Sequence, residues 1–477
     1  MPMRTKAGST AAGSTEAGST VAETAAQPAV VDGAVVDDTV ADAAGEPAVA
    51  EYRSLWHNHD FLRFWFGETL SLMGTQVTNL ALPLTAIYAF GATEDQVGVL
   101  RFLQLVPYIG LALLFGVWVD RVSRRAVMLY SNLVRMVLVG LVPLMYELHM
   151  LNMGLLMVIA CVLGIASVLF DVSWMPFVPV LVKHPKYYVE ANSKMGISQS
   201  STDVAGPGFA GLLVAAVSAP IALVVDAVSY LISAITLMQI HIDEPRKPAA
   251  ERHVLTELRD GLRWVFGNSI LRWLAFIGFC CNFSMITVWT MFLLYGTKDL
   301  HLGSSTLGGI FAMASVGGLI GAMLSRRVLA RFPLGRVYLI AQSGLLLGPI
   351  FIVLASGPRI AMVAVFILSF FTTYLGLGIA GVIVVSVRQT TTPVSMMGRM
   401  TACFRMLLFG GGALGGLNAG LLSGAVGARH AIAIAATASA LVVIGLILSP
   451  VSRLRELPPA VEEPFEESLG AVANAPS

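Results

Sequence analysis

The sequence predicts an all-helical integral membrane protein with twelve transmembrane helices, arranged as two six-helix halves related by a pseudo-two-fold axis. The first observation is composition: the chain of 477 residues is 56% hydrophobic and only 12% charged, whereas a soluble domain is about a quarter charged. The second is the length of the apolar blocks, which reach the roughly 20 residues that cross a bilayer. The third is a glycine-rich pattern that recurs in both halves.

The segment before the first apolar block has no signal-peptide core. It repeats AGST and consists mainly of small residues, valine and acids. Because it has too little bulky apolar surface to fold, we expect a disordered cytoplasmic tail over residues 1–51. The four cysteines lie in apolar blocks and form no CxxC pair, so we expect no disulfide framework, no metal site and no cofactor.

Apolar blocks separated by turn residues or charges define the twelve spans. A polar connector over 242–269 separates an amino-terminal half over 52–241 from a carboxy-terminal half over 270–450, and a cytoplasmic tail follows over 451–477. The predicted spans are 64–90, 97–119, 126–146, 151–182, 192–217 and 221–240 in the first half, and 270–295, 307–329, 337–354, 360–387, 400–426 and 431–448 in the second.

Apolar residues within the connector recur at helical spacing between Val254 and Phe266. This pattern predicts an amphipathic helix on the membrane face. We interpret this helix as a structural strap in preference to a surface for a partner protein.

Lysine and arginine concentrate in alternate loops, among them 121–125, the connector, 326–336 and 388–399. Because cytoplasmic loops of membrane proteins are enriched in these residues, the pattern predicts that these loops are cytoplasmic. With an even number of spans, both termini lie on the same side. We therefore expect a multi-pass protein of the plasma membrane with both termini in the cytoplasm.

The stretch 116–125, GVWVDRVSRR, places four charges between two apolar blocks. The positive-inside bias accounts for its arginines but not for its acid, because acidic residues gain nothing from that bias. We therefore predict a hydrogen-bonded latch in the cytoplasmic turn between the second and third spans. Its residues are Gly116, Asp120, Arg121, Arg124 and Arg125.

Two alignments between the halves indicate a duplicated chain. GVWVDRV aligns with GAMLSRR, and GPGFAGLL at 206–213 aligns with GGLNAGLL at 415–422. The first alignment joins the second and eighth spans and the other joins the fifth and eleventh, which are corresponding positions in the two halves.

Two six-helix halves related in parallel, with a substrate site between them, are the layout of major facilitator transporters. The sequence resembles that superfamily over residues 52–450. GVWVDRVSRR matches the superfamily's GxLxDRxGRR loop except at Trp118 and Ser123, and GPGFAG matches its GPxxGG motif except at Ala210. LFDVSWMPFVPVLV and VVDAVSYLIS are similar to the bacterial drug- and siderophore-efflux branch, which includes enterobactin-exporter-like and macrolide-efflux-like proteins.

This resemblance implies that the halves rock about a central site, that the 116–125 loop is a cytoplasmic gate contacting the other half, and that the fifth-span motif is associated with export. The motif's small residues by themselves predict close helix packing, and its proline predicts a kink. Packing alone and packing with an export bias both stay open. The motif residues are Gly206, Pro207, Gly208 and Gly211.

Acidic residues within spans are costly and therefore mark candidate sites. Asp203 is the sharpest candidate, because it lies about 16 Å into its span, near the middle of a membrane core about 30 Å thick. It is a candidate for proton coupling or substrate contact, with a helix–helix hydrogen bond as the alternative. The other candidates are Glu68, Asp226 and Arg405. The alternatives for Glu68 are that it snorkels to the membrane surface or lines the cytoplasmic mouth, and the alternative for Asp226 is packing or gating.

Arg405 either pairs with an acid across the two halves or binds an anionic group. Arg135 and Asp171 lie in adjacent spans at similar depths, about 14–16 Å from the cytoplasmic face. This depth match predicts a buried ion pair between Arg135 and Asp171.

Together these features predict a secondary active transporter that exports a small organic compound, such as a drug, siderophore or secondary metabolite, by proton antiport. The sequence has no GxxxxGK[ST] motif for ATP and no residue cluster typical of an enzyme. Expected partners are the small-molecule substrate, protons and the bilayer; we expect a monomer and no nucleic-acid partner. The alternatives are an importer or uniporter of the same fold, or a non-transporting membrane receptor or scaffold.

Overall fold

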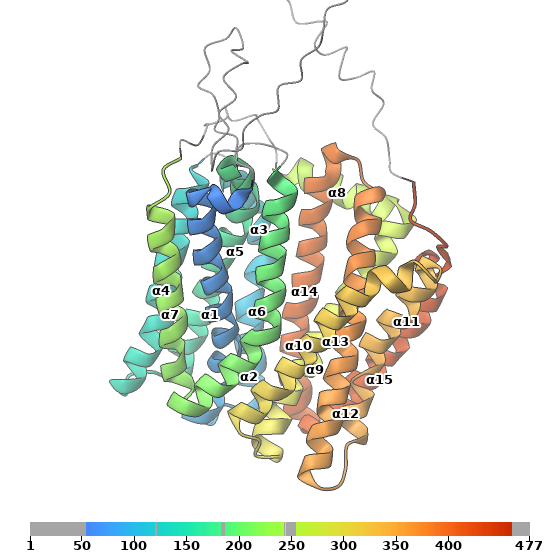
Figure 1. Cartoon of the computed structure of the whole chain (residues 1–477). Coiled ribbons are helices and arrows are strands. Elements are labelled where there is room, and N and C mark those ends of the chain that lie inside the picture. Colours follow the sequence, from blue (N-terminus) through green and yellow to red (C-terminus); the bar gives the residue numbers. More distant parts are fainter. Residues whose placement is uncertain (1–53, 120–121, 183–186, 243, 245–253, 460–477) are drawn as a thin grey trace, which may run out of the picture. The chain divides into compact units, whose positions relative to one another are not determined.

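The computed structural model describes residues 54–119, 122–182, 187–242, 244 and 254–459. The tail predicted over 1–51, most of the predicted C-terminal tail and part of the connector lie outside the described residues, as do Asp120 and Arg121 of the predicted latch. The described chain consists of helices joined by short turns (Figure 1).

The amino-terminal half supplies six spans. The second is broken into two helices at Pro107, because proline has no backbone N–H to continue the helical ladder. After a short 3-10 helix η1 (Leu55–His57), the helices are α1 (His59–Phe90), α2 (Glu94–Leu105) with α3 (Pro107–Val119), α4 (Arg124–Glu147), α5 (Met153–Val182), α6 (Tyr188–Val217) and α7 (Ala219–Met238).

The connector contains the helix expected there, α8 (Val254–Gly267). The carboxy-terminal half then supplies six more spans, of which the third is broken at Pro349. Its helices are α9 (Ser269–Leu294) with a π-helical turn η3 (Tyr295–Asp299), α10 (Ser304–Leu329), α11 (Leu334–Leu347) with α12 (Ile350–Leu354), α13 (Arg359–Thr390), α14 (Val394–Val426), α15 (Ala428–Leu448) and a 3-10 turn η4 (Pro450–Arg453).

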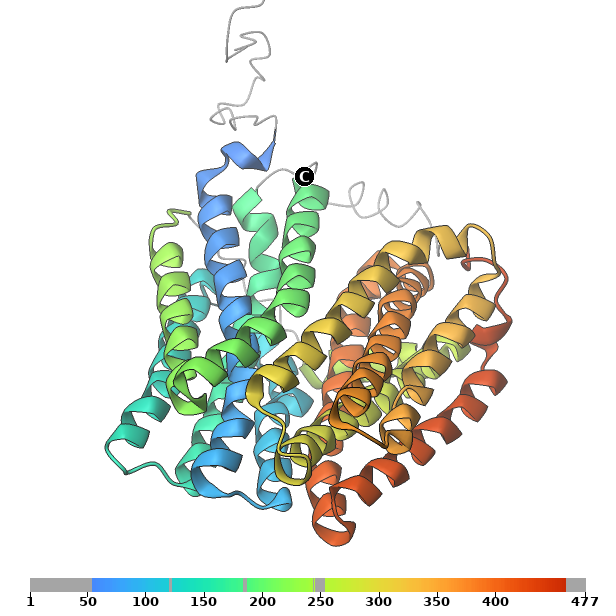
Figure 2. The ribbon, with the colours of Figure 1, turned by 60° about the horizontal axis from the view of Figure 1, so that its bottom comes forward.

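Among the described helices, nine are long and apolar enough to cross a membrane, and the bent α6 is a tenth. The other two spans do not meet this criterion of length and hydropathy, because α1 contains many polar residues and the second span is divided between α2 and α3. The twelve-helix prediction is confirmed, as two bundles of six spans that Figures 1 and 2 show side by side.

The duplication is visible in the details of the helix ends. Asn58 caps α1 by accepting the backbone N–H of Phe61, and Asn268 caps α9 in the same way from Ile270 and Leu271. An asparagine at this position satisfies backbone donors that the first turn leaves free. Each half therefore starts its first span with the same cap.

The helix ends define two faces of the bundle. We call the face with Asn58, Ser123 and Ser449 the terminal face, and the face with the turns at Gly91, Ser218 and Gly427 the distal face. Because the number of spans is even, both ends of the described chain lie on the terminal face.

Among the residues that the structure describes, the two halves share one apolar core toward the distal face. There one buried cluster includes Leu80 and Ile87 from α1 together with Phe292 and Phe311 from the other half. Toward the terminal face the core separates into two clusters, one within the amino-terminal half around Phe64 and Phe177, and one within the carboxy-terminal half. The halves are therefore joined at the distal face.

Candidate transport site

Four glycines close the distal end of the interface between the halves. A Cβ added to Gly98 in α2 would lie 2.5 Å from the Cα of Gly420 in α14, and one added to Gly211 in α6 would lie 2.5 Å from the Cα of Gly308 in α10. Such backbone contact is possible only between small residues. The two contacts are equivalent under the internal repeat, so the same seal is made twice.

An ion pair lies beside this seal. Lys298, in the π-helical turn η3, donates to Glu94 at the start of α2 over 3.0 Å. Both side chains are about 30% exposed, with Lys298 at 28% and Glu94 at 30%. The pair joins the two halves at the distal face.

Asp203 lies halfway along α6, at the centre of the bundle. Its Oδ1 accepts hydrogen bonds from the amide of Gln76 in α1, at 2.9 Å, and from Gln199 one turn earlier, at 3.0 Å. Tyr374 of α13 in the other half is within electrostatic reach. The residue is nevertheless exposed, so its carboxyl group keeps free acceptor capacity at the interface.

Arg101 of α2 supplies a positive group on the distal side of Asp203. Its guanidinium donates to Gln104 over 2.9 Å and to Asn79 over 3.4 Å. It also lies over the ring of Trp289 from the other half, 5.1 Å from the centroid, a cation–π geometry. The centre of the interface thus presents an anion, a cation and aromatic surface.

Arg405 and Asp171 form the central bridge between the halves. The guanidinium of Arg405 in α14 donates to Oδ2 of Asp171 in α5 over 3.3 Å. The hydroxyl of Tyr108 donates to the same oxygen over 2.9 Å, and the Tyr108 ring stacks on Phe409 with centroids 4.1 Å apart. Of the two roles that the sequence left open for Arg405, the structure shows the pairing with an acid across the halves.

The predicted ion pair between Arg135 and Asp171 is wrong. Arg135 donates to Asn132 and is sandwiched between Phe170 and Tyr230, 4.2 and 4.4 Å from the ring centroids. Phe170 and Asp171 are consecutive, so they point about 100° apart around α5. Phe170 therefore faces Arg135 inside the half, while Asp171 faces Arg405 in the other half.

Two further acids are buried inside the amino-terminal half. Glu68 is only 5% exposed and lies within electrostatic reach of Arg135 and Asp171. It neither snorkels nor lines an open mouth. Asp226 is fully buried in α7, where Thr78 donates to Oδ2 and the Ser229 hydroxyl lies 3.0 Å from Oδ1.

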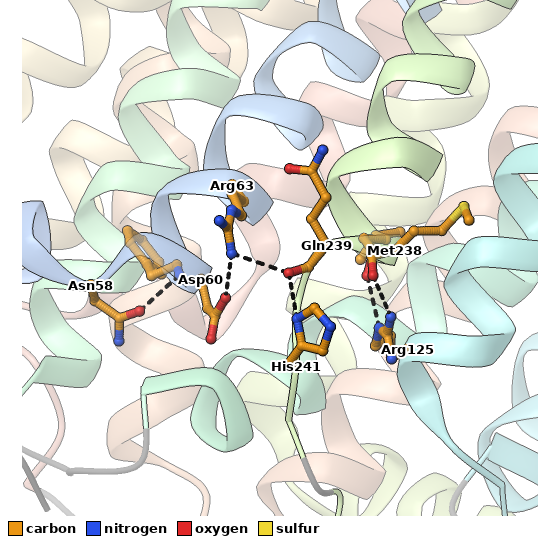
Figure 3. A network of polar contacts seen from close by, with 9 residues as sticks. Asn58, Asp60, Arg63, Arg125, Met238, Gln239 and His241 are labelled. Atoms are coloured by element: carbon orange, nitrogen blue, oxygen red, sulfur yellow. Dashed lines mark hydrogen bonds and ion pairs between the residues drawn. The ribbon is translucent and has the colours of Figure 1, made fainter.

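Arg125, from the predicted latch, binds within its own half. Its guanidinium donates over 2.7 Å to the carbonyls of Leu237 and Met238 at the end of α7, and Arg63 donates to the next carbonyl, that of Gln239, over 3.1 Å (Figure 3). Cations are stabilising at a helix C-terminus, where carbonyls lack helical partners. Arg125 is thus a cap for α7.

Glu244, just beyond α7, caps the neighbouring helix in return. Its carboxylate accepts from the Ser123 hydroxyl and from the backbone N–H groups of Arg124 and Arg125, over 2.7 to 2.9 Å. A carboxylate at a helix N-terminus is favoured by the same backbone dipoles. The described part of the 116–125 loop is therefore held to the start of the connector, and its predicted contact with the other half is a proposal that depends on Asp120 and Arg121.

The GPGFAG motif combines packing with the placement of Asp203. A Cβ on Gly206 would lie 2.5 Å from Cγ of Gln76, and one on Gly208 would lie 3.0 Å from Ala312. α6 is bent by 41° between Glu190–Asp203 and Ala205–Val217. Pro207 has no N–H for the carbonyl four residues earlier, that of Asp203. The bend thus lies next to the central carboxylate.

Sequence reasoning missed Glu244 and the pair of Glu94 with Lys298. Glu244 could have been found, because it is an acid that follows the end of the sixth span and could pair with the arginine-rich turn at 121–125. No sequence pattern identifies the other pair, because its partners are far apart in the chain. Among the residues that the structure describes, no group of three histidine, cysteine or acidic side chains could hold a metal ion.

Twelve spans in two duplicated halves, joined at one face and with charged and aromatic side chains at the centre of their interface, define a membrane transporter. The sequence matches the Major Facilitator Superfamily over residues 64–416. The chain belongs to this superfamily, and it is a transporter, not an enzyme.

Curated relatives include the multidrug efflux pump Tap of Mycolicibacterium fortuitum, 27% identical over 80% of this chain and 93% of the relative. Tap of Mycobacterium tuberculosis is 23% identical over 85% and 96% of the two chains. Among solved structures, the nucleoside transporter NupG superposes with a TM-score of 0.66 at 13% identity, covering 82% of this chain and 98% of its own. An inward-facing bacterial homologue of the lysosomal transporter Spinster gives 0.63 at 14% identity, covering 83% and 96%.

Proposed function

We propose that the protein exports amphiphilic organic cations. Asp203 is the observation that carries this proposal: it is an exposed carboxylate at the centre of the interface, with free acceptor capacity and aromatic side chains from the other half nearby. A carboxylate beside aromatic rings suits a cation with an apolar body. The relatives named multidrug efflux pumps support export.

Transport is driven by proton antiport in this proposal. The lack of an ATP-binding motif supports an ion gradient as the energy source. The buried acids Glu68 and Asp226 provide groups that can bind a proton. Substrate and protons then cross in opposite directions as the two halves rock.

The terminal face is cytoplasmic in this proposal. Arg124, Arg125, Arg326 and Arg327 all lie at helix ends on that face, which agrees with the positive-inside bias. With this orientation, the glycine contacts and the Glu94–Lys298 pair close the extracellular side, and the separated cores lie on the cytoplasmic side. The structure then represents a state that receives substrate from the cytoplasm.

Reconstituted vesicles test this function with ethidium, a cation whose charge does not change with pH. The full-length protein is placed in liposomes with an acidic lumen and a membrane potential clamped at zero. We expect ethidium to accumulate in the lumen as protons leave. Asp203→Asn should weaken ethidium binding by about 10- to 100-fold, the effect of losing one charge-assisted interaction of about 1.5–3 kcal/mol. Glu147→Gln, at an exposed acid on the distal face, is the matched control.

The rival functions give different results in the same vesicles. Ethidium movement that ignores the pH gradient indicates a uniporter. Movement of ethidium and protons in the same direction indicates a symporter, as an importer requires. If none of a panel of cationic, neutral and anionic compounds moves, a receptor or scaffold becomes the better description.

A further inference from the structure

In the described core of the amino-terminal half, two buried acids lie around a single buried base. Glu68, Arg135 and Asp226 are 5%, 5% and 0% exposed, and Arg135 is within electrostatic reach of both acids. The fourth buried charge, Lys194, pairs with Glu190 over 3.5 Å. Two carboxyl groups therefore share one guanidinium.

An uncompensated carboxylate in such a core is strongly unfavourable, because burial removes its hydration. In the state that the structure shows, one of the two acids therefore holds a proton. Asp226 accepts from Thr78 and is within hydrogen-bond distance of Ser229, which favours its ionised form. Oε2 of Glu68 is buried and has no hydrogen-bond partner. The neutral member of the pair is therefore Glu68.

The groups around Glu68 are arranged to respond to loss of that proton. Arg135 comes from α4, Asp171 from α5 and Tyr230 from α7, and all three are within electrostatic reach of Glu68. From α6, Ser198 bonds to Thr69 beside Glu68. The Nε of Arg135 is buried without an acceptor, so this donor is available to an ionised Glu68.

We propose that Glu68 binds the proton exchanged during transport, at a site separate from the substrate carboxylate Asp203. The inference rests on the proposed antiport. The O–H bond of Glu68 breaks, its proton passes to water, and the carboxylate then pairs with Arg135. Asp171, whose side chain is 30% exposed, connects this core to solvent. Uptake of a proton from the opposite side reverses the step.

The same proton acts on the bridge between the halves. Phe170 stacks on Arg135, and the next residue, Asp171, binds Arg405 of the other half. An ionised Glu68 repels Asp171 and draws Arg135 toward itself. Loss of the proton therefore changes the charge balance around the Asp171–Arg405 contact, which links proton release to the bridge between the halves.

Two modes of ethidium transport separate this proposal from a purely structural role for Glu68. Exchange of ethidium across the liposome membrane without a pH gradient requires only substrate binding and rocking. Accumulation against a gradient also requires the proton. For one-to-one exchange, a difference of about two pH units supports up to about 100-fold accumulation.

We expect Glu68→Gln, a mimic of the protonated acid, to retain exchange and to lose accumulation. Glu68→Asp should regain accumulation with a shifted pH profile, and Glu147→Gln should match the wild type. Accumulation by Glu68→Gln at the wild-type level would overturn the proposal. So would loss of exchange together with accumulation in folded Glu68→Gln, or a wild-type pH profile in Glu68→Asp. The wild-type vesicles report separately on the antiport itself: no response to the pH gradient there would refute the proposed function.

Discussion

The two halves share a scaffold but differ in the chemistry of their cores. In its described residues, the amino-terminal half buries four charged side chains, Glu68, Arg135, Lys194 and Asp226. In the described part of the carboxy-terminal half, the buried polar side chains are neutral, among them Gln342, Ser284 and Thr287. The caps and glycine contacts are repeated, whereas the charges are not.

The difference can be followed position by position. Counted from the first residue of each helix, Glu68 in α1 corresponds to Gly278 in α9, and Arg135 in α4 to Leu345 in α11. Asp226 in α7 corresponds to Ala435 in α15. The comparison indicates that one half holds the ionisable core, and that the other contributes mainly surface to the interface, through Trp289, Tyr374 and Arg405.

The largest effect on stability is expected when Arg135 is replaced by leucine, the residue at the corresponding position of the carboxy-terminal half. Arg135→Leu leaves Asp226 buried without its cation, which should cost about 3–5 kcal/mol of stability. Adding Asp226→Ala removes both charges and should restore most of the loss. Thermal unfolding of the purified protein measures both variants. If Arg135→Leu alone were as stable as the wild type, Arg135 would not compensate the charge of Asp226.

The bridge between the halves should give a smaller, conformational effect. Asp171 and Arg405 are 30% and 28% exposed, so their pair is worth on the order of 1 kcal/mol after screening. Asp171→Asn should therefore shift the balance between conformations by about fivefold. Spin labels at Ile197 in α6 and Met323 in α10, both exposed, report the distance between the halves. An unchanged distance distribution in Asp171→Asn and in Arg405→Gln would argue against a bridge.

The distal ion pair should stay closed across the physiological pH range. Partial burial alone would raise the pKa of Glu94, but the hydrogen bond and charge of Lys298 outweigh this, so the pKa lies below its ordinary value. A lowered pKa means that the pair is intact above about pH 4.5 and is lost as the pH falls below that value. We expect Glu94→Gln to loosen the distal seal equally at about pH 6 and pH 8.

Cross-linking of cysteines placed across the distal seal measures that effect. If the loosening of the seal in Glu94→Gln differed strongly between about pH 6 and pH 8, a titratable group other than Glu94 would control the seal.

The last effect, on stability alone, concerns a turn in which the halves differ by one residue. Ser218 before α7 has φ 89° and ψ 158°, and Gly427 before α15 has φ 78° and ψ 152°. This region is disfavoured for residues with a side chain, at a cost of about 1–3 kcal/mol. Ser218→Gly should therefore raise the unfolding temperature slightly, and Gly427→Ser should lower it. A lower temperature for Ser218→Gly would contradict this reading of the strain.

Helix number, the duplication and the depth of charged residues could be predicted from the sequence, because each depends on hydropathy along the chain. Asp203 was placed near the middle of its span for this reason, and the structure puts both Asp203 and Arg405 at the interface between the halves. Depth along a helix follows from counting residues at 1.5 Å each.

The direction in which a side chain points could not be predicted in the same way. Arg135 and Asp171 match in depth, yet Asp171 faces the other half, since the packing of α5 against α4 is made by Phe170. The partners of Arg125 were equally hidden, because they are backbone carbonyls at the end of α7. The contacts of the 116–125 loop with the other half stay a prediction.

Proton release on substrate binding tests most directly the claim that one half carries the proton. Ethidium is added to the purified full-length protein in lightly buffered detergent at about pH 7, and released protons are counted with a pH indicator. We predict that the wild type releases protons and that Glu68→Gln binds ethidium without releasing any. Undiminished release by Glu68→Gln would contradict the claim and place the proton on another group.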